Sequence, residues 1–178
     1  MKTFVMTITT SSLIVLLFAL YTTQSRASPA NNAIEQTCKR TPNYNLCVSS
    51  LRSDPRSSDA DVRGLALIMV GVIEAKAKET LSHIKDLIKA SPKRDEKQPL
   101  SSCADYYNAI ITADVPQATQ ALKTGNYKFA EQGTDDTENE ADFCEKSFSG
   151  RSPLTEMNKL VHDVAAIAAA MTRILLSS

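Results

Sequence analysis

The side chains that could perform catalysis are few in this 178-residue sequence, and they do not converge on one motif. His83 and His162 are its two histidines, and neither has the Glu-x-x-His partner of a carboxylate-rich metal site in a helical bundle. The sequence contains no G-x-S-x-G, no glycine-rich phosphate loop and no H-E-x-x-H. We therefore predict no catalytic residue, no metal site, no cofactor and no enzyme, and we interpret both histidines as helix-surface residues.

Carboxylates are concentrated in one segment of the chain. They are Asp135, Asp136, Glu138, Glu140 and Asp142. Glycoside hydrolysis would need two of them held at a fixed separation. The hydrophobic periodicity is poor here, and Gly133 favours a loop or a broken helix. We interpret the segment as a solvated acidic loop rather than an active site.

A different kind of chemistry is indicated by Tyr127-Lys128-Phe129, which follows a helix-ending Gly125. Two aromatic rings beside a cation at an exposed corner lower solubility through their apolar surface, so such a group indicates a binding role. Lys128 suits a carboxylate and Phe129 suits apolar walls, so the pair fits a concave acidic pocket on another protein. Alternatively, Tyr127 and Phe129 simply close the end of the hydrophobic core. The residue pattern alone leaves both interpretations open.

Residues 1–27 have the pattern of a secretory signal peptide. Lys2 supplies the positive end, an apolar run covers residues 13–20, and Ser25-Arg26-Ala27 offers a cleavage site. The apolar run of eight residues is too short for a membrane-spanning helix, which needs about 20. We predict cleavage near Ala27 and a single mature domain over residues 28–178.

The four cysteines, Cys38, Cys47, Cys103 and Cys144, all follow that segment. An even number of cysteines on an oxidising route predicts two disulfides, and the lack of C-x2-C argues against zinc. Four cysteines allow three pairings. Pairing nearest neighbours would close two separate loops.

Charge excludes some partners. The chain has 20 basic and 20 acidic side chains, and the predicted signal peptide carries two of the basic ones and no acidic one, so the mature net charge is −2. This balance gives no electrostatic reason to bind nucleic acid or an anionic membrane.

The elements that must position these residues are helices. The periodicity predicts a long amphipathic helix that is capped by Asp59 or Asp61 and ends near Ser91. A second helix starts near Leu100, is interrupted by Pro116 and ends at Gly125. A third starts after Asn126 and is broken near Gly133. The last helix is predicted to be capped by Ser152, with Pro153 as its first residue.

Two short helices are predicted within residues 31–51, the second capped by Thr41 with Pro42 at its first position. No strand-like alternation occurs in the sequence. The predicted fold is therefore all-α: an antiparallel up-down-up-down four-helix bundle with an N-terminal helical hairpin.

The mature region resembles the plant invertase and pectin methylesterase inhibitor family. The resemblance rests on residues 37–47 (TCKRTPNYNLC), 65–70 (LALIMV), Cys103 after Pro99-Leu100, and 125–131 (GNYKFAE). It implies a four-helix bundle with a helical hairpin, and disulfides Cys38–Cys47 and Cys103–Cys144, the first of which staples the hairpin.

The same resemblance implies a function. Inhibitors of acid invertase in this family carry a Pro-Lys-Phe motif in a loop between two bundle helices, and that motif reaches into the invertase active site. Lys128 and Phe129 match it, whereas Tyr127 stands where proline is usual and so removes a fixed φ angle. We expect a secreted inhibitor of a cell-wall or vacuolar acid invertase. Inhibition of pectin methylesterase, which uses a different face of the bundle, is the alternative.

Overall fold

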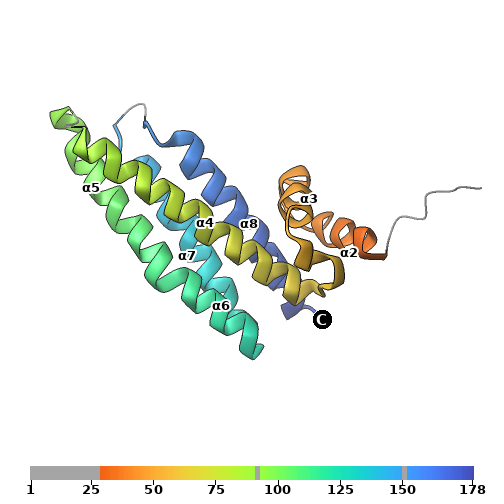
Figure 1. Cartoon of the computed structure of the whole chain (residues 1–178). Helices are drawn as coiled ribbons and strands as arrows, with labels where there is room; N and C mark the ends of the chain where they lie inside the picture. The colour runs from red at the N-terminus through yellow and green to blue at the C-terminus, as the bar shows by residue number, and fades with distance from the viewer. Residues whose placement is uncertain (1–28, 91–92, 150–151) are drawn as a thin grey trace, which may run out of the picture.

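The computed structural model describes residues 29–90, 93–149 and 152–178, which form helices joined by short turns (Figure 1). The predicted signal peptide lies outside these residues. The elements in chain order are α2 (Pro29–Cys38), α3 (Tyr44–Arg52), η1 (Pro55–Asp59), α4 (Val62–Lys89), α5 (Arg94–Ala109), η2 (Ile110–Asp114), α6 (Val115–Thr124), α7 (Tyr127–Lys146) and α8 (Thr155–Leu176). The described residues contain no strand, as predicted.

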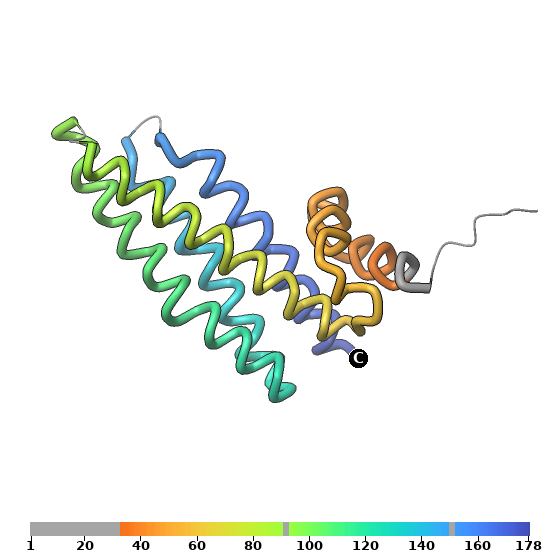
Figure 2. The backbone as a smooth tube through the Cα atoms, viewed as in Figure 1, coloured from red at the N-terminus to blue at the C-terminus, as the bar shows by residue number. Residues whose placement is uncertain are grey.

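Four long helical rods make the bundle: α4, the continuous stretch α5–η2–α6, α7 and α8. Successive rods run in opposite directions, as the backbone trace shows (Figure 2). Their apolar faces meet in one core, whose largest fully buried side chains include Leu65, Met69, Tyr107, Leu122 and Met171. The predicted bundle is therefore confirmed.

The helix α4 begins as the sequence predicts, because the side chain of Asp61 accepts a hydrogen bond from the Gly64 amide at 2.7 Å. The next helix begins earlier than predicted. α5 starts at Arg94 rather than near Leu100. Asp95 and Glu96 lie in its first turn, where negative side chains interact favourably with the positive end of the helix dipole.

Pro116 interrupts its helix in a specific way. The backbone widens into the π-helical turn η2 just before it, and α6 then resumes with Pro116 near its first position. A proline there lacks the amide hydrogen that the preceding turn would otherwise use. The π turn absorbs that loss without separating α5 from α6.

The predicted break near Gly133 is wrong, because α7 is a continuous helix of 20 residues. Gly133 is buried, and a Cβ built on it would lie 2.8 Å from the Asp114 carbonyl oxygen and 3.1 Å from the Ala118 amide nitrogen. The glycine therefore serves close packing between helices rather than a turn. It lets the backbone of α7 lie directly against η2 and the start of α6.

The N-terminal hairpin, α2 and α3, packs on one end of the bundle against α4 and α8 (Figure 1). The disulfide Cys38–Cys47 joins the two helices, and Ile34 and Leu51 extend the main core into the hairpin. The predicted cap at Thr41 is wrong. Asn43 occupies the N-cap position, with a φ of 52°, and the Thr41 hydroxyl donates to the Cys38 carbonyl instead.

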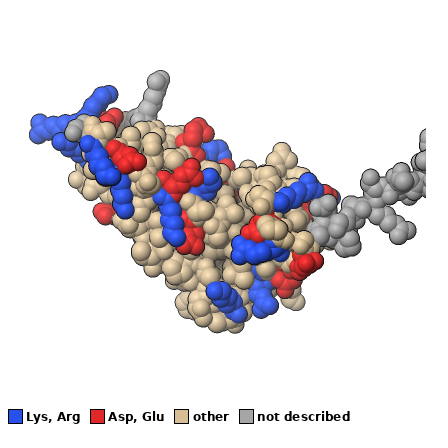
Figure 3. Space-filling model, in the orientation of Figure 1, with Lys and Arg blue, Asp and Glu red and all other residues tan. Residues whose placement is uncertain are grey.

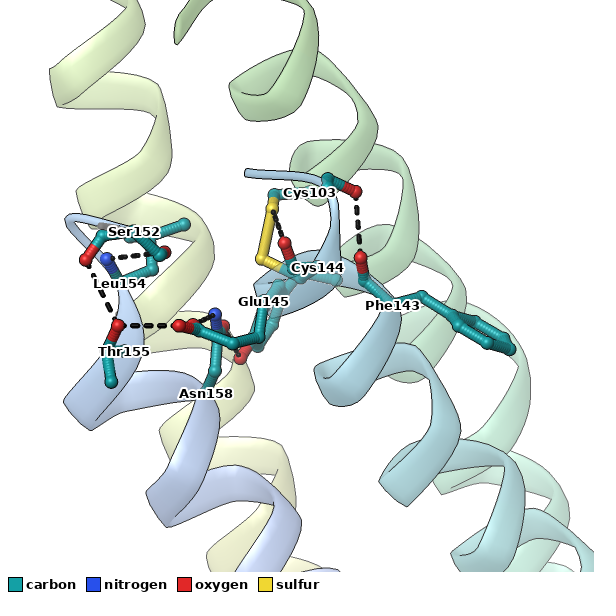
Figure 4. Close-up of a disulfide and its surroundings, with 10 residues drawn as sticks. Cys103, Phe143, Cys144, Glu145, Ser152, Leu154, Thr155 and Asn158 are labelled. Atoms are coloured by element: carbon teal, nitrogen blue, oxygen red, sulfur yellow. Dashed lines mark hydrogen bonds between the residues drawn. A yellow bond between two sulfur atoms is a disulfide. The ribbon is translucent and has the colours of Figure 1, made fainter. Parts of the chain in front are cut away.

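The second disulfide, Cys103–Cys144, joins α5 to α7 at the other end, with a Cα–Cα distance of 4.6 Å (Figure 4). Both pairings implied by the family resemblance are thus present. Beside it, Glu145 accepts hydrogen bonds from Thr155 (2.6 Å) and from the buried Asn158 (2.7 Å). Asn158 in turn accepts one from the Tyr107 hydroxyl at 2.8 Å, so this network connects α5, α7 and α8.

The start of α8 differs from the prediction by two residues. The helix begins at Thr155, and Ser152 does not cap it. The Ser152 hydroxyl instead accepts from the Leu154 amide at 3.0 Å and so shapes the turn before the helix.

The close contact at Gly133 can be tested against a second helical glycine. We expect Gly133→Ala to lower the free energy of unfolding by about 1–3 kcal/mol, because the methyl group forces two backbones apart. A Cβ at Gly71, in the middle of α4, would meet nothing within 4 Å. Gly71→Ala should therefore raise stability by roughly 0.5–1 kcal/mol through helix propensity. Urea unfolding of both variants measures this, and equal effects would refute the close-packing role.

Candidate functional site

The turn between α6 and α7 lies at the end of the bundle where α4 begins and α8 ends (Figure 1). Gly125 ends α6 with a φ of 76°, a left-handed conformation that favours glycine. The Asn126 amide then donates to the Ala121 carbonyl at 2.8 Å, which closes the last turn. α7 starts at the next residue, so only two residues separate the helices.

Tyr127, Lys128 and Phe129 form the first turn of α7 rather than a loop. Tyr127 stands at the first helical position, where proline is also favoured, and it packs against the core. The side chain of Lys128 is 80% exposed and Phe129 is 53% exposed. The two interpretations left open by the sequence therefore divide between residues: Tyr127 closes the core, whereas Lys128 and Phe129 face outward.

The exposed pair has support from neighbouring helices. Gln117 of α6 donates from Nε2 to the Phe129 carbonyl at 3.3 Å. The Lys128 ammonium lies 2.7 Å from a Glu131 carboxylate oxygen, and Glu131 is also 2.8 Å from Nε of Arg173 on α8. Arg173 reaches Asp135 as well, at 2.6 Å. These cations hold the pKa of Glu131 below its ordinary value, chiefly through the hydrogen bond from Lys128.

Phe129 is the most exposed of the large apolar side chains that the structure describes. The other exposed large apolar side chains, all less exposed than Phe129, are Tyr44, Ile88, Phe143 and Leu176. Lys and Arg side chains gather elsewhere, over the end of the bundle where α4 meets α5 (Figure 3). Lys128 is therefore not part of that basic surface. It is one cation beside one exposed aromatic ring.

The acidic segment predicted as a loop lies on α7, so its carboxylates point in different directions. Asp135 faces Arg173. Glu138 and Asp142 each lie 3.8 Å from Nε2 of His162 on α8, whose side chain is partly exposed as predicted. The turns of one helix thus distribute this charge among separate partners.

The remaining carboxylates of this segment, Asp136 and Glu140, lie near Asp114, which belongs to the π turn η2. One carboxylate oxygen of Asp114 and one of Glu140 are buried and have no hydrogen-bond partner. Burial, followed by the nearby charge of Asp136, raises the pKa of Asp114 from 3.8 to about 6. Burial also raises the pKa of Glu140, with Asp114 and Asp136 contributing. At neutral pH, burial and mutual repulsion therefore make the ionised forms of Asp114 and Glu140 unfavourable.

Three further features of the described residues bear on their chemistry. Within the three described ranges, no group of histidine, cysteine and acidic side chains could hold a metal ion. No helix in the same ranges is long and apolar enough to cross a membrane. All four cysteines are in disulfides. What the corner offers chemically is one exposed cation and one exposed aromatic ring on the first turn of α7.

Sequence reasoning found the exposed pair but missed the residues that surround it. The sequence places Glu131 in the motif without showing its role, and it gives no indication of Gln117 or Arg173. Lys128 and Glu131 are three residues apart, a spacing that puts them on one helix face. No local signal reveals Arg173, because it is 42 residues from Glu131.

The fold defines a class of small helical-bundle proteins that are held by two disulfides. A family model, plant invertase/pectin methylesterase inhibitor, matches residues 32–171. The chain therefore belongs to the plant invertase/pectin methylesterase inhibitor family. This family is named for inhibitors, not for enzymes.

Individual relatives agree with that membership. The chain is 44% identical to cell wall/vacuolar inhibitor of fructosidase 1 from Arabidopsis thaliana over 138 residues, or 78% of this chain and 66% of the relative. It is 32% identical to a pectinesterase inhibitor from Actinidia deliciosa, over 79% of this chain and 76% of the relative. The chain thus spans just under two thirds of that fructosidase inhibitor.

Solved structures show the same fold. A mutant form of a pectin methylesterase inhibitor from Arabidopsis superposes with a TM-score of 0.69 at 21% identity, over 79% of this chain and 95% of that one. At this level of identity the likeness concerns the fold alone.

The raised pKa of Asp114 predicts how stability depends on pH. The folded state favours the protonated carboxyl, so the penalty is full above pH 6 and disappears as pH falls towards 4. We expect Asp114→Asn to be more stable than wild type at pH 7 by about 1–2 kcal/mol, after allowance for solvent screening. The difference should vanish near pH 4.

Urea unfolding at the two pH values measures this difference. Asp105→Asn, on the exposed face of α5, is the control and should change little at either pH. An Asp114→Asn protein with the same pH dependence as wild type would show that this carboxyl is not strained.

Proposed function

We propose that this protein inhibits plant acid invertases, of the cell wall or the vacuole, by placing Lys128 and Phe129 in the enzyme's active site. The observation that carries the proposal is the exposed Lys–Phe pair on the first turn of α7, at a corner of the bundle. The relatives named as inhibitors of fructosidase support it.

The chemistry of the target fits such a pair. A sugar-cleaving pocket must hold two carboxyl groups that flank the glycosidic bond. Lys128 supplies a positive charge to those carboxylates, and Phe129 fills apolar space. Sucrose is then excluded by occupation of its site, and no covalent step is needed.

Rigidity adds to affinity. A short turn and a helix that begins at Tyr127 hold the backbone of the pair before binding, so little conformational entropy is lost on association. Tyr127 replaces the proline usual in the motif, and its packing against the core restrains the same position.

Location follows from the same proposal. Two disulfides are typical of proteins that pass through an oxidising secretory route. The predicted signal peptide of residues 1–27 agrees with that route. We propose the cell wall or the vacuole as the destination, where the acid invertases work.

Inhibition of pectin methylesterase is the second candidate function. It is favoured by the relative from Actinidia deliciosa, and by a second exposed aromatic on another part of the bundle. Phe143 is 48% exposed, and its ring centroid lies 5.9 Å from that of Tyr106 on α5. This pair joins α5 and α7, far along α7 from Phe129.

The variant Lys128→Ala/Phe129→Ala tests the main proposal. We expect the inhibition constant for acid invertase to rise by at least about 100-fold, because an exposed cation and ring supply the anchor. The circular dichroism spectrum should not change, since neither side chain is in the core.

Phe143→Ala is the matched control, because Phe143 lies on the same helix with similar exposure. It should leave inhibition of invertase intact. The same proteins are assayed against pectin methylesterase in parallel. A double variant that still inhibits invertase fully would rule out the corner as the anchor, and loss of pectin methylesterase inhibition in Phe143→Ala would support the second candidate.

Binding should also depend on pH. The wall and the vacuole, where we propose that the protein acts, are acidic, so binding should be strongest at the acidic pH at which acid invertases work. We expect tighter association at pH 5 than at pH 7, measured by titration calorimetry with purified invertase. Equal or tighter association at pH 7 would contradict this expectation.

A further inference from the structure

The Lys128 ammonium is not free in the unbound protein. It is paired with Glu131, one turn along the same helix, and Glu131 is only 13% exposed. If Lys128 moved to carboxylates of a partner, Glu131 would lose a counter-ion while the interface removed its remaining water. A carboxylate that is desolvated and unpaired is strongly unfavourable.

Arg173 supplies a second counter-ion from a different helix. Its Nε atom lies 2.8 Å from one Glu131 oxygen, and Lys128 is 2.7 Å from the other. The two cations therefore do not compete for the same atom. When Lys128 leaves, Glu131 keeps its bond to Arg173.

The position of Arg173 is itself fixed. Its Nη2 atom donates to Asp135 at 2.6 Å, so the planar guanidinium bridges two carboxylates one turn apart on α7. Arginine can do this because its donors form a rigid fork, whereas lysine presents a single centre. Arg173 thereby also holds the end of α8 against the first two turns of α7.

We infer that Arg173 is a positioning residue that releases Lys128 for binding, by keeping Glu131 paired when the Lys128–Glu131 contact opens. This inference rests on the proposed function of Lys128. Arg173 lies outside the motif, yet it decides how easily Lys128 can leave Glu131. Without Arg173, Glu131 would hold Lys128 as its sole counter-ion.

Removing the charge of Arg173 and removing the charge of Glu131 should have opposite effects on inhibition. We expect Arg173→Gln to weaken inhibition of acid invertase by roughly 10-fold, because Lys128 must then abandon an unpaired Glu131. Glu131→Gln should strengthen inhibition by about 3-fold, because the ammonium loses its internal partner. The double variant Glu131→Gln/Arg173→Gln should behave like Glu131→Gln.

Rescue of one loss by removal of a second charge is not expected of a merely structural arginine. Arg52→Gln is the matched control. Arg52 is 47% exposed and 2.8 Å from Glu35, much as Arg173 is 51% exposed and 2.8 Å from Glu131. It should leave inhibition unchanged. Full inhibition by Arg173→Gln, or a double variant as weak as Arg173→Gln, would overturn the inference.

A measurement without any enzyme separates this inference from the proposed function. The order parameter of the Lys128 ammonium, from nitrogen relaxation of the free protein, should rise in Arg173→Gln, because Glu131 then holds Lys128 alone. An unchanged order parameter would overturn the inference. By contrast, normal inhibition by Lys128→Ala together with a raised order parameter in Arg173→Gln would refute the proposed function of Lys128 and leave the ionic arrangement standing.

Discussion

The backbone of α7 lies against η2 and the start of α6 at Gly133, and the packing of these three elements depends on this contact. A side chain there would meet the Asp114 carbonyl oxygen at 2.8 Å. The contact brings the first turn of α7 within reach of Gln117. It also buries the Asp114 carboxyl among other carboxylates, at a cost to the folded state at neutral pH. Close packing of the helices and an unfavourable charge arrangement therefore have one origin.

The elements with a strong local signal could be predicted from sequence. The apolar periodicity of α4 and α8 is set by the same burial that the structure shows, and Gly125 ends α6 because few other residues adopt a φ of 76° easily. The exposed Lys128–Phe129 pair follows from that turn. Helix starts were harder, because Asn43 and Leu154 begin α3 and α8 with no side-chain cap bond.

What could not be predicted depends on contacts between helices. Gly133 suggested a break because local propensity disfavours glycine in a helix, but packing against α6 outweighs that preference. The polar sequence of α7 has little apolar periodicity, since it contacts its neighbours largely through small residues such as Ala130, Ala141 and Thr137. The partnership of Glu131 with Arg173 exists only once α7 and α8 are side by side.

After the short turn at Gly125, the groups that fix the start of α7 are different from the side chains that are exposed there. Backbone bonds, a buried alanine and the inward tyrosine start α7, whereas the side chains at positions 128 and 129 contribute nothing to the core. Mutations at these two positions are therefore nearly free of folding consequences. Substitutions there can change the chemistry of the exposed corner while the helices that hold it stay in place.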